Sequence, residues 1–160
     1  MGRLILITGN RGAGKTRFCT LVARRMQQRG FDVAGMLSPA RFEGTLKVGI
    51  DALDLRSNRT RPLAQLIETN PHSDTQTGHW AFDDLTLAWG DSCLRAATPC
   101  DLLIIDELGP LEFIHAKGWL SGLGALDSFR YRLALVVIRP ELMEAAQTRW
   151  PGCGIFHIGG

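Results

Sequence analysis

A chain of 160 residues is long enough for one domain with a hydrophobic core and too short for two, so we expect a single domain over residues 1–160. The formal charge of +2 is too small to indicate a nucleic-acid or membrane partner. The longest apolar runs have the length of strands, which predicts no membrane span, and the first run begins too early to leave room for a signal peptide. The cysteines show no Cys-x-x-Cys spacing, so we expect a reducing, cytoplasmic setting.

The chain begins with a short, β-branched apolar run over residues 3–8, which predicts a buried parallel strand. The next eight residues fit the pattern Gly-x-x-x-x-Gly-Lys-[Ser/Thr] at every position: Gly9, Asn10, Arg11, Gly12, Ala13, Gly14, Lys15 and Thr16. In such a loop the backbone N–H groups surround the phosphates, the lysine reaches the β- and γ-phosphates, and the hydroxyl ligates Mg²⁺. A helix predicted over residues 18–29 places its N-terminus at the loop, where it favours an anion. We therefore predict a nucleotide site with Lys15 as the catalytic cation, Thr16 as a metal ligand and Arg17 as a further phosphate contact.

The middle of the chain departs from simple strand–helix alternation. A second strand is predicted over residues 32–37, and a Glu-Gly turn between two extended arms predicts a β-hairpin that starts at Arg41. The polar loop after it carries Arg56, Arg59 and Arg61, and one hypothesis is that these arginines clamp a phosphate. Residues 70–79 have the most loop-like composition. We therefore interpret residues from about 41 to 80 as a hairpin and loop insertion.

The second half of the chain returns to alternating elements. A helix is predicted from Asp83 or Asp84 to Ala97. Its expected inward face consists of Leu85, Ala88, Trp89, Cys93 and Ala96 or Ala97. Further strands are expected over residues 101–106, 133–138 and 154–158, and further helices over residues 119–129 and 140–150. This alternation predicts an α/β fold, with a mostly parallel sheet covered by helices on both faces and an inserted β-hairpin.

An acidic pair, Asp106 and Glu107, follows the strand predicted over residues 101–106. A carboxylate at this end of a strand is expected near Mg²⁺, which assigns Asp106 to the metal, and an acidic residue beside it can orient the attacking water, which assigns Glu107 to catalysis. The alternative is a solvated pair that caps the following turn. Glu112 either assists at the site or faces solvent. Arg139 follows another buried strand and is a candidate transition-state cation, or else a surface arginine beside Pro140.

The segment Asp106-Glu107-Leu108-Gly109-Pro110-Leu111-Glu112, together with the loop at residues 9–16, resembles the small P-loop nucleoside-triphosphatases known from archaea, bacteria and animals, in animals as cancer-related nucleoside-triphosphatase. The resemblance extends to Arg29-Gly30-Phe31 and to the hairpin at residues 41–51, where Gly49-Ile50 stands for the family's Gly-Phe-like pair. It implies a RecA-like P-loop fold, a three-layer α/β/α sandwich. It also implies Mg²⁺-dependent hydrolysis of ATP, GTP and other nucleoside triphosphates with little base selectivity. The implied roles are phosphate binding for residues 9–16, metal binding for Thr16 and Asp106, and water activation for Glu107.

Two other functions share the phosphate loop. A small nucleotide or nucleoside kinase transfers phosphate to an acceptor, but Glu107 directly after Asp106 favours water as the acceptor. A non-catalytic nucleotide-dependent switch or adaptor that reads guanine usually carries Asn-Lys-x-Asp, and neither Lys47 nor Lys117 has those neighbours. The substrate expected is therefore a nucleoside triphosphate, with no nucleic-acid partner and a monomer or weak homo-oligomer as the assembly.

Overall fold

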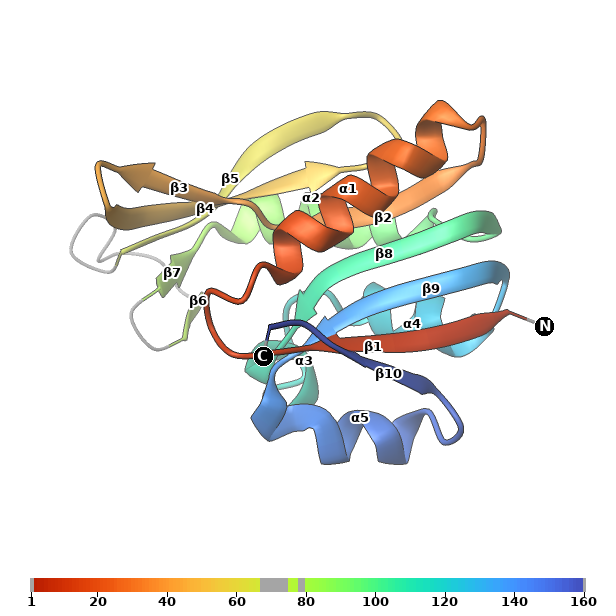
Figure 1. Cartoon of the computed structure of the whole chain (residues 1–160). Helices are drawn as coiled ribbons and strands as arrows, with labels where there is room; N and C mark the ends of the chain where they lie inside the picture. Colours follow the sequence, from red (N-terminus) through yellow and green to blue (C-terminus); the bar gives the residue numbers. More distant parts are fainter. Residues whose placement is uncertain (1, 67–74, 78–79, 160) are drawn as a thin grey trace.

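The computed structural model describes residues 2–66, 75–77 and 80–159. Within them, one sheet of ten strands runs through the molecule (Figure 1). The strands are β1 (Arg3–Thr8), β2 (Val33–Leu37), β3 (Ala40–Glu43), β4 (Leu46–Asp54), β5 (Arg59–Leu66), β6 (Thr75–Thr77), β7 (Trp80–Phe82), β8 (Cys100–Leu108), β9 (Tyr131–Ile138) and β10 (Gly154–His157). The helices are α1 (Lys15–Gln28), α2 (Asp84–Arg95), α3 (Pro110–Phe113), α4 (Leu120–Ser128) and α5 (Met143–Arg149), with a short 3₁₀ turn at Pro140–Leu142.

The sheet has a parallel half and an antiparallel half. The strands β10, β1, β9, β8 and β2 lie side by side in that order and are all parallel. From β2 outward the sheet continues antiparallel through β4, β5, β7 and β6, and β3 pairs with β4. The predicted parallel central sheet is confirmed. The inserted region contains more strand than predicted, because β5 includes Arg59 and Thr60, which were expected in a polar loop, and pairs along β4.

Helices cover both faces of the sheet, which gives three layers. In Figure 1, α1 lies in front of β2 and β8, whereas α2 and α4 lie behind the sheet. Cys19 and Ala23 of α1 pack against one set of buried strand residues, and α2, α4 and α5 share a second core on the other face. Strand β8 lies between β2 and β9, and its run Leu102–Ile105 is almost wholly buried, as expected for a central strand. None of the described helices has both the length and the apolar composition needed to cross a membrane.

Helix α2 begins as predicted, and its inward face is only partly the predicted one. The Asp83 side chain caps it by accepting a hydrogen bond from the Thr86 N–H at 3.0 Å. The predicted Trp89, Cys93 and Ala97 do pack on the core. Leu87, Gly90 and Leu94 are buried, whereas Leu85 is 81% exposed and Ala88 is exposed, so the prediction was wrong for those two residues. The cause is tertiary: a Cβ at Gly90 would lie 2.6 Å from the Trp119 indole nitrogen, so the glycine lets that ring pack directly on the helix.

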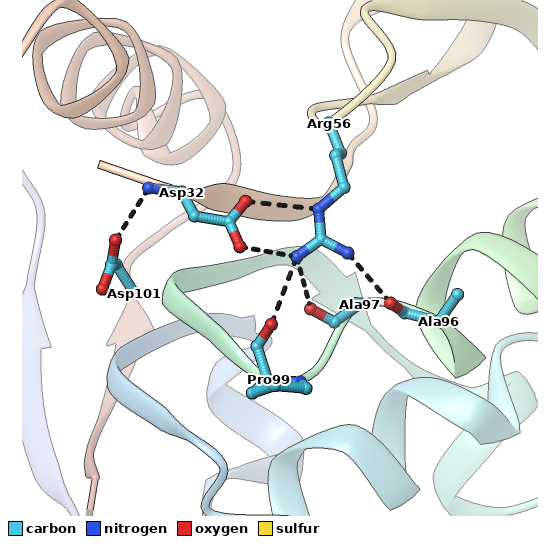
Figure 2. A network of polar contacts seen from close by, with 6 residues as sticks. All are labelled: Asp32, Arg56, Ala96, Ala97, Pro99 and Asp101. Atoms are coloured by element: carbon cyan, nitrogen blue, oxygen red, sulfur yellow. Dashed lines mark hydrogen bonds and ion pairs between the residues drawn. The ribbon is translucent and has the colours of Figure 1, made fainter. Parts of the chain in front are cut away.

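Arg56, hypothesised to clamp a phosphate, lies instead at the opposite edge of the parallel strands (Figure 2). Its guanidinium donates to the Asp32 carboxylate, to Oδ2 at 2.9 Å and Oδ1 at 3.3 Å. It also donates to three main-chain carbonyls just after α2, those of Ala96, Ala97 and Pro99, at 2.9, 3.0 and 3.3 Å. Asp32 directly precedes β2, so Arg56 is separated from the far end of that strand by roughly 16 Å. The phosphate-clamp hypothesis was therefore wrong for Arg56, which fastens α2 to the start of the sheet.

Candidate active site

The phosphate loop joins the end of β1 to the start of α1. Helix α1 begins at Lys15, three residues earlier than predicted, so Lys15, Thr16 and Arg17 form its first turn. Their N–H groups have no partner within the helix and create an anion site at its N-terminus. Gly14 has a φ of +97°, a left-handed conformation that glycine adopts without strain. The Lys15 ammonium donates to the carbonyls of Gly9 at 2.6 Å and Asn10 at 3.1 Å, which holds the charge over the loop.

Asp106 is buried at the carboxyl end of β8, next to the phosphate loop. Its side chain is only 2% exposed, and Oδ2 accepts a hydrogen bond from the Ser38 N–H at 3.0 Å. Burial raises the pKa of this carboxyl, while hydrogen bonds from Ser38 and Thr16 and the charge of Lys15 act in the opposite direction. The Ser38 hydroxyl also donates to the Asp106 carbonyl at 3.2 Å. The structure therefore brings together three of the predicted residues, Lys15, Thr16 and Asp106.

Thr16 and Asp106 fit the requirements of a magnesium site. They supply a hydroxyl and a carboxylate oxygen at the same place, and Mg²⁺ prefers hard oxygen ligands. Mg²⁺ at nucleotide sites is usually held by one or two protein groups plus phosphates and water. Among the residues that the structure describes, no three His, Cys, Asp or Glu side chains cluster into a metal cage. A metal bound here would therefore take its remaining ligands from the nucleotide and from water.

Glu107 and Arg139 form an ion pair at the mouth of this site. The Arg139 Nε donates to Oε1 of Glu107, and the two side chains are 44% and 38% exposed. Arg139 directly follows β9, which lies beside β8. Glu107 has a φ of +72°, and the register between β8 and β9 shifts between Ile105 and Leu108. An irregularity of this kind beside an active site re-aims a side chain, and here it turns Glu107 toward Arg139.

Glu112 has a structural role within the loop that follows β8. Its Oε1 accepts from the Gly109 N–H at 2.9 Å, and its Oε2 accepts from the Trp119 N–H at 2.8 Å. The side chain is 9% exposed, so the alternative that it faces solvent was wrong. Burial raises the pKa of Glu112, although both amide donors oppose that shift. Because both oxygens already accept backbone hydrogen bonds, Glu112 fixes the shape of residues 109–119.

A pocket of about 630 Å³ lies beside the phosphate loop, on the side of the carboxyl terminus. One wall is the loop and the end of β1, and the other comes from the 3₁₀ turn, α5 and the end of β10: Pro140, Met143, His157, Ile158 and Gly159. The Ile158 N–H donates to the Thr8 carbonyl at 2.8 Å, which ties the two walls together. Arg17 is exposed and is not among the described lining residues.

Sequence reasoning missed the second wall of this pocket and also missed Ser38. The pocket wall gave no usable signal, because nothing in the pattern says that β10 lies beside β1. Ser38 gave a weak signal, since a polar residue directly follows β2. That signal becomes useful only once β2 is known to lie beside β8.

The chain matches known proteins both in sequence and in structure. A family model described as NTPase matches residues 4–122. The nucleoside-triphosphatase THEP1 of Thermofilum pendens is 31% identical over 132 residues, which cover 82% of this chain and 71% of that protein. The THEP1 of Caldivirga maquilingensis is 30% identical over 111 residues, which cover 69% of this chain and 61% of that protein. For several such relatives the matched part is about 60% of their own length.

Solved structures agree with the fold described above. A solution structure of a human cancer-related nucleoside triphosphatase superposes with a TM-score of 0.73 at 21% identity, covering 99% of this chain and 89% of that one. The crystal structure of THEP1 from Aquifex aeolicus gives a TM-score of 0.66 at 17% identity, covering 97% of this chain and 89% of that one. These two likenesses bear on the fold, and the sequence matches carry the family. The predicted family is confirmed, and the chain belongs to the NTPase family that includes the nucleoside-triphosphatases THEP1.

Proposed function

We propose that this chain hydrolyses nucleoside triphosphates to nucleoside diphosphate and phosphate in a Mg²⁺-dependent reaction. In that reaction water adds to the γ-phosphorus, and the bond from that phosphorus to the bridging oxygen breaks. The observation that carries the proposal is the grouping of Thr16 and Asp106 at the phosphate loop, with the Glu107 carboxylate next to them on β8. The activity named for its relatives supports the same reaction.

Each residue has a role that follows from its chemistry. Lys15, now bonded to two loop carbonyls, can exchange these for β- and γ-phosphate oxygens. Thr16 and Asp106 would hold Mg²⁺, which supplies positive charge against the phosphates. Glu107 would accept a hydrogen bond from the attacking water and orient it. Arg139 is the proposed transition-state cation, and a phosphate arriving at the site would compete with Glu107 for it.

Low base selectivity is the second part of the proposal, and it is supported by the lining of the pocket. None of the described lining residues is acidic, so the described lining offers no carboxylate with which to read a base. Much of the lining is glycine or apolar, as at Gly12, Ala13 and Ile158, which suits packing against any base. Thr8 also lines the pocket, and its hydroxyl is buried and has no hydrogen-bond partner in the described residues. A cytoplasmic location is also part of the proposal, because the cysteine spacing gives no sign of a disulfide framework.

The test is steady-state phosphate release from ATP, GTP, CTP and UTP with Mg²⁺ and no added acceptor. We expect turnover of all four within about tenfold, complete dependence on Mg²⁺ when EDTA is added, and loss of nucleotide binding in Lys15→Ala. Strict dependence on an added phosphate acceptor would overturn hydrolysis in favour of a kinase. Tight binding of GTP alone without turnover would instead indicate a switch.

A further inference from the structure

Lys47 lies in the inserted, antiparallel half of the sheet, near the start of β4. The chain reaches it directly from the active site, because Ser38, which binds Asp106, is followed two residues later by β3. Lys47 pairs with Phe42 across the hairpin, so its backbone stands roughly 13 Å along the strand from Ser38. In Figure 1 this hairpin lies on the side of the molecule toward which β1 and β8 run.

The hairpin that carries Lys47 is held in one conformation. The Arg41 Nε and the Asp51 carboxylate form an ion pair of 3.0 Å, and the Asp51 N–H donates to the Pro39 carbonyl at 2.9 Å. The Arg41 guanidinium packs on Gly49, where a Cβ would come within 2.5 Å of it. The base of the hairpin is therefore anchored beside the end of β2. This fixes the position from which the Lys47 side chain extends.

The charges that act on the Lys47 ammonium are those of the active site. They come from Arg11 in the phosphate loop, from Asp106 and Glu107 on β8, and from Arg139 after β9. Partial burial lowers the pKa of Lys47, and the two arginines lower it further, while the two carboxylates oppose them. Lys47 thus shares one electrostatic environment with groups from the phosphate loop, from β8 and from the residue that follows β9.

Lys47 has no carboxylate partner in the described residues, unlike Arg139. Arg139 is paired with Glu107, and Lys15 is bonded to the carbonyls of its own loop. The Lys47 ammonium instead lies over the Trp80 ring, 5.2 Å from its centroid. A cation–π contact holds an ammonium in place without neutralising it, so its charge stays available to an anion.

We propose that Lys47 is a catalytic cation that binds the γ-phosphate of the nucleotide and stabilises the charge that develops there during hydrolysis. This inference rests on the proposed hydrolysis and adds a residue to the same site. The inserted hairpin would then complete the site in cis, opposite Lys15 and the metal. The Trp80 ring would act as a positioning group that holds the ammonium where it can contact the γ-phosphate.

The test uses three variants of the full chain. Lys47→Met keeps the aliphatic stem against Trp80 and removes the charge, Lys47→Arg keeps the charge, and Lys117→Met is a control on an exposed loop lysine. We expect Lys47→Met to lower kcat by about 100-fold or more, the size of effect seen when a transition-state donor is removed. Lys47→Arg should recover most of that loss, and Lys117→Met should match the unmodified chain.

A binding measurement separates this inference from the proposed function. Affinities are measured for a non-hydrolysable triphosphate analogue and for the corresponding diphosphate. Lys47→Met should lose about tenfold or more for the analogue and less than threefold for the diphosphate. Unchanged kcat and unchanged preference for the analogue would overturn the inference, and so would an equal loss for both ligands. If the unmodified chain releases no phosphate but keeps a Lys47-dependent preference, the proposed hydrolysis fails while the γ-phosphate contact stands.

Discussion

Glu107 and Arg139 partly neutralise each other beside Asp106. Both side chains are more than a third exposed, so their ion pair contributes little to stability, about 0–1 kcal/mol. The main effect of the pair is that its two opposite charges offset each other within the site.

The first prediction concerns Glu107→Gln. This change should lower kcat by about 10²–10⁴-fold, because an amide cannot act as the base or orient water as a carboxylate does. Affinity for a non-hydrolysable triphosphate should hold steady or rise, since Arg139 is freed and a negative charge is removed. Phosphate release and analogue binding are the measurements, with the exposed Glu141→Gln as a matched control. Near-normal turnover would remove Glu107 from the mechanism.

At the scale of elements, the two ends of the parallel strands have different roles. The carboxyl ends of β1, β2 and β8 carry the phosphate loop, Ser38 and the acidic pair. The starts of β2 and β8 are joined through Arg56, Asp32 and Asp101, whose carboxylate accepts from the Asp32 N–H at 2.8 Å (Figure 2). One end is therefore arranged for ligands, and the other attaches α2 to the sheet.

The second prediction follows from this separation. Arg56→Met should lower the free energy of unfolding by about 1–3 kcal/mol, because the three carbonyls after α2 and the Asp32 carboxylate lose their shared donor. Its kcat and KM should stay within about twofold of the unmodified chain. Urea unfolding and phosphate release measure the two quantities.

The control for that prediction is Arg95→Met. It breaks an exposed pair with Asp91 one helical turn away, which is worth only about 0.3–0.5 kcal/mol. If Arg56→Met kept full stability and lost turnover, the phosphate-clamp hypothesis would have to be restored.

For the molecule as a whole, buried carboxyl groups link stability to pH. The pKa of Glu112 in the folded chain is raised above its ordinary value of 4.5 by burial. Between the ordinary and the raised pKa, the folded chain binds more protons than the unfolded chain, so the free energy of unfolding falls as pH rises through that interval. Asp106 acts in the same direction.

The third prediction isolates the Glu112 contribution with Glu112→Gln. We compare the unfolding free energy of the unmodified chain with that of this variant. The value for the unmodified chain minus the value for the variant should decrease as pH rises above about 4.5, and then level off. Asp106 is present in both proteins and cancels. Urea unfolding between pH 4 and pH 8 with EDTA measures the difference. A difference that moves the other way would mean that the Gly109 and Trp119 amides outweigh burial.

Predictions from local patterns were reliable where the feature depends only on residues that are adjacent in sequence. The apolar run before Gly9, the spacing of Lys15 and Thr16, and the apolar strand ending at Asp106 each depend on neighbours in sequence. The burial of α2 at Gly90 could not be predicted, because it depends on Trp119, which lies just before α4 and packs there. Glu112 was ambiguous for the same reason, since one of its two partners, Trp119, lies seven residues away across a loop.

The sequence by itself determined the α/β class, the phosphate loop, the Asp106–Glu107 pair and the family, because motif spacing and apolar period are properties of contiguous residues. Only the tertiary structure decided which distant groups meet that pair. It brought Ser38 to Asp106 and Arg139 to Glu107, and it removed Arg56 to the opposite edge. The physical reason is strand order: hydrogen bonds between β8, β2 and β9 set these neighbours, and residues far apart in the chain meet only when the sheet forms.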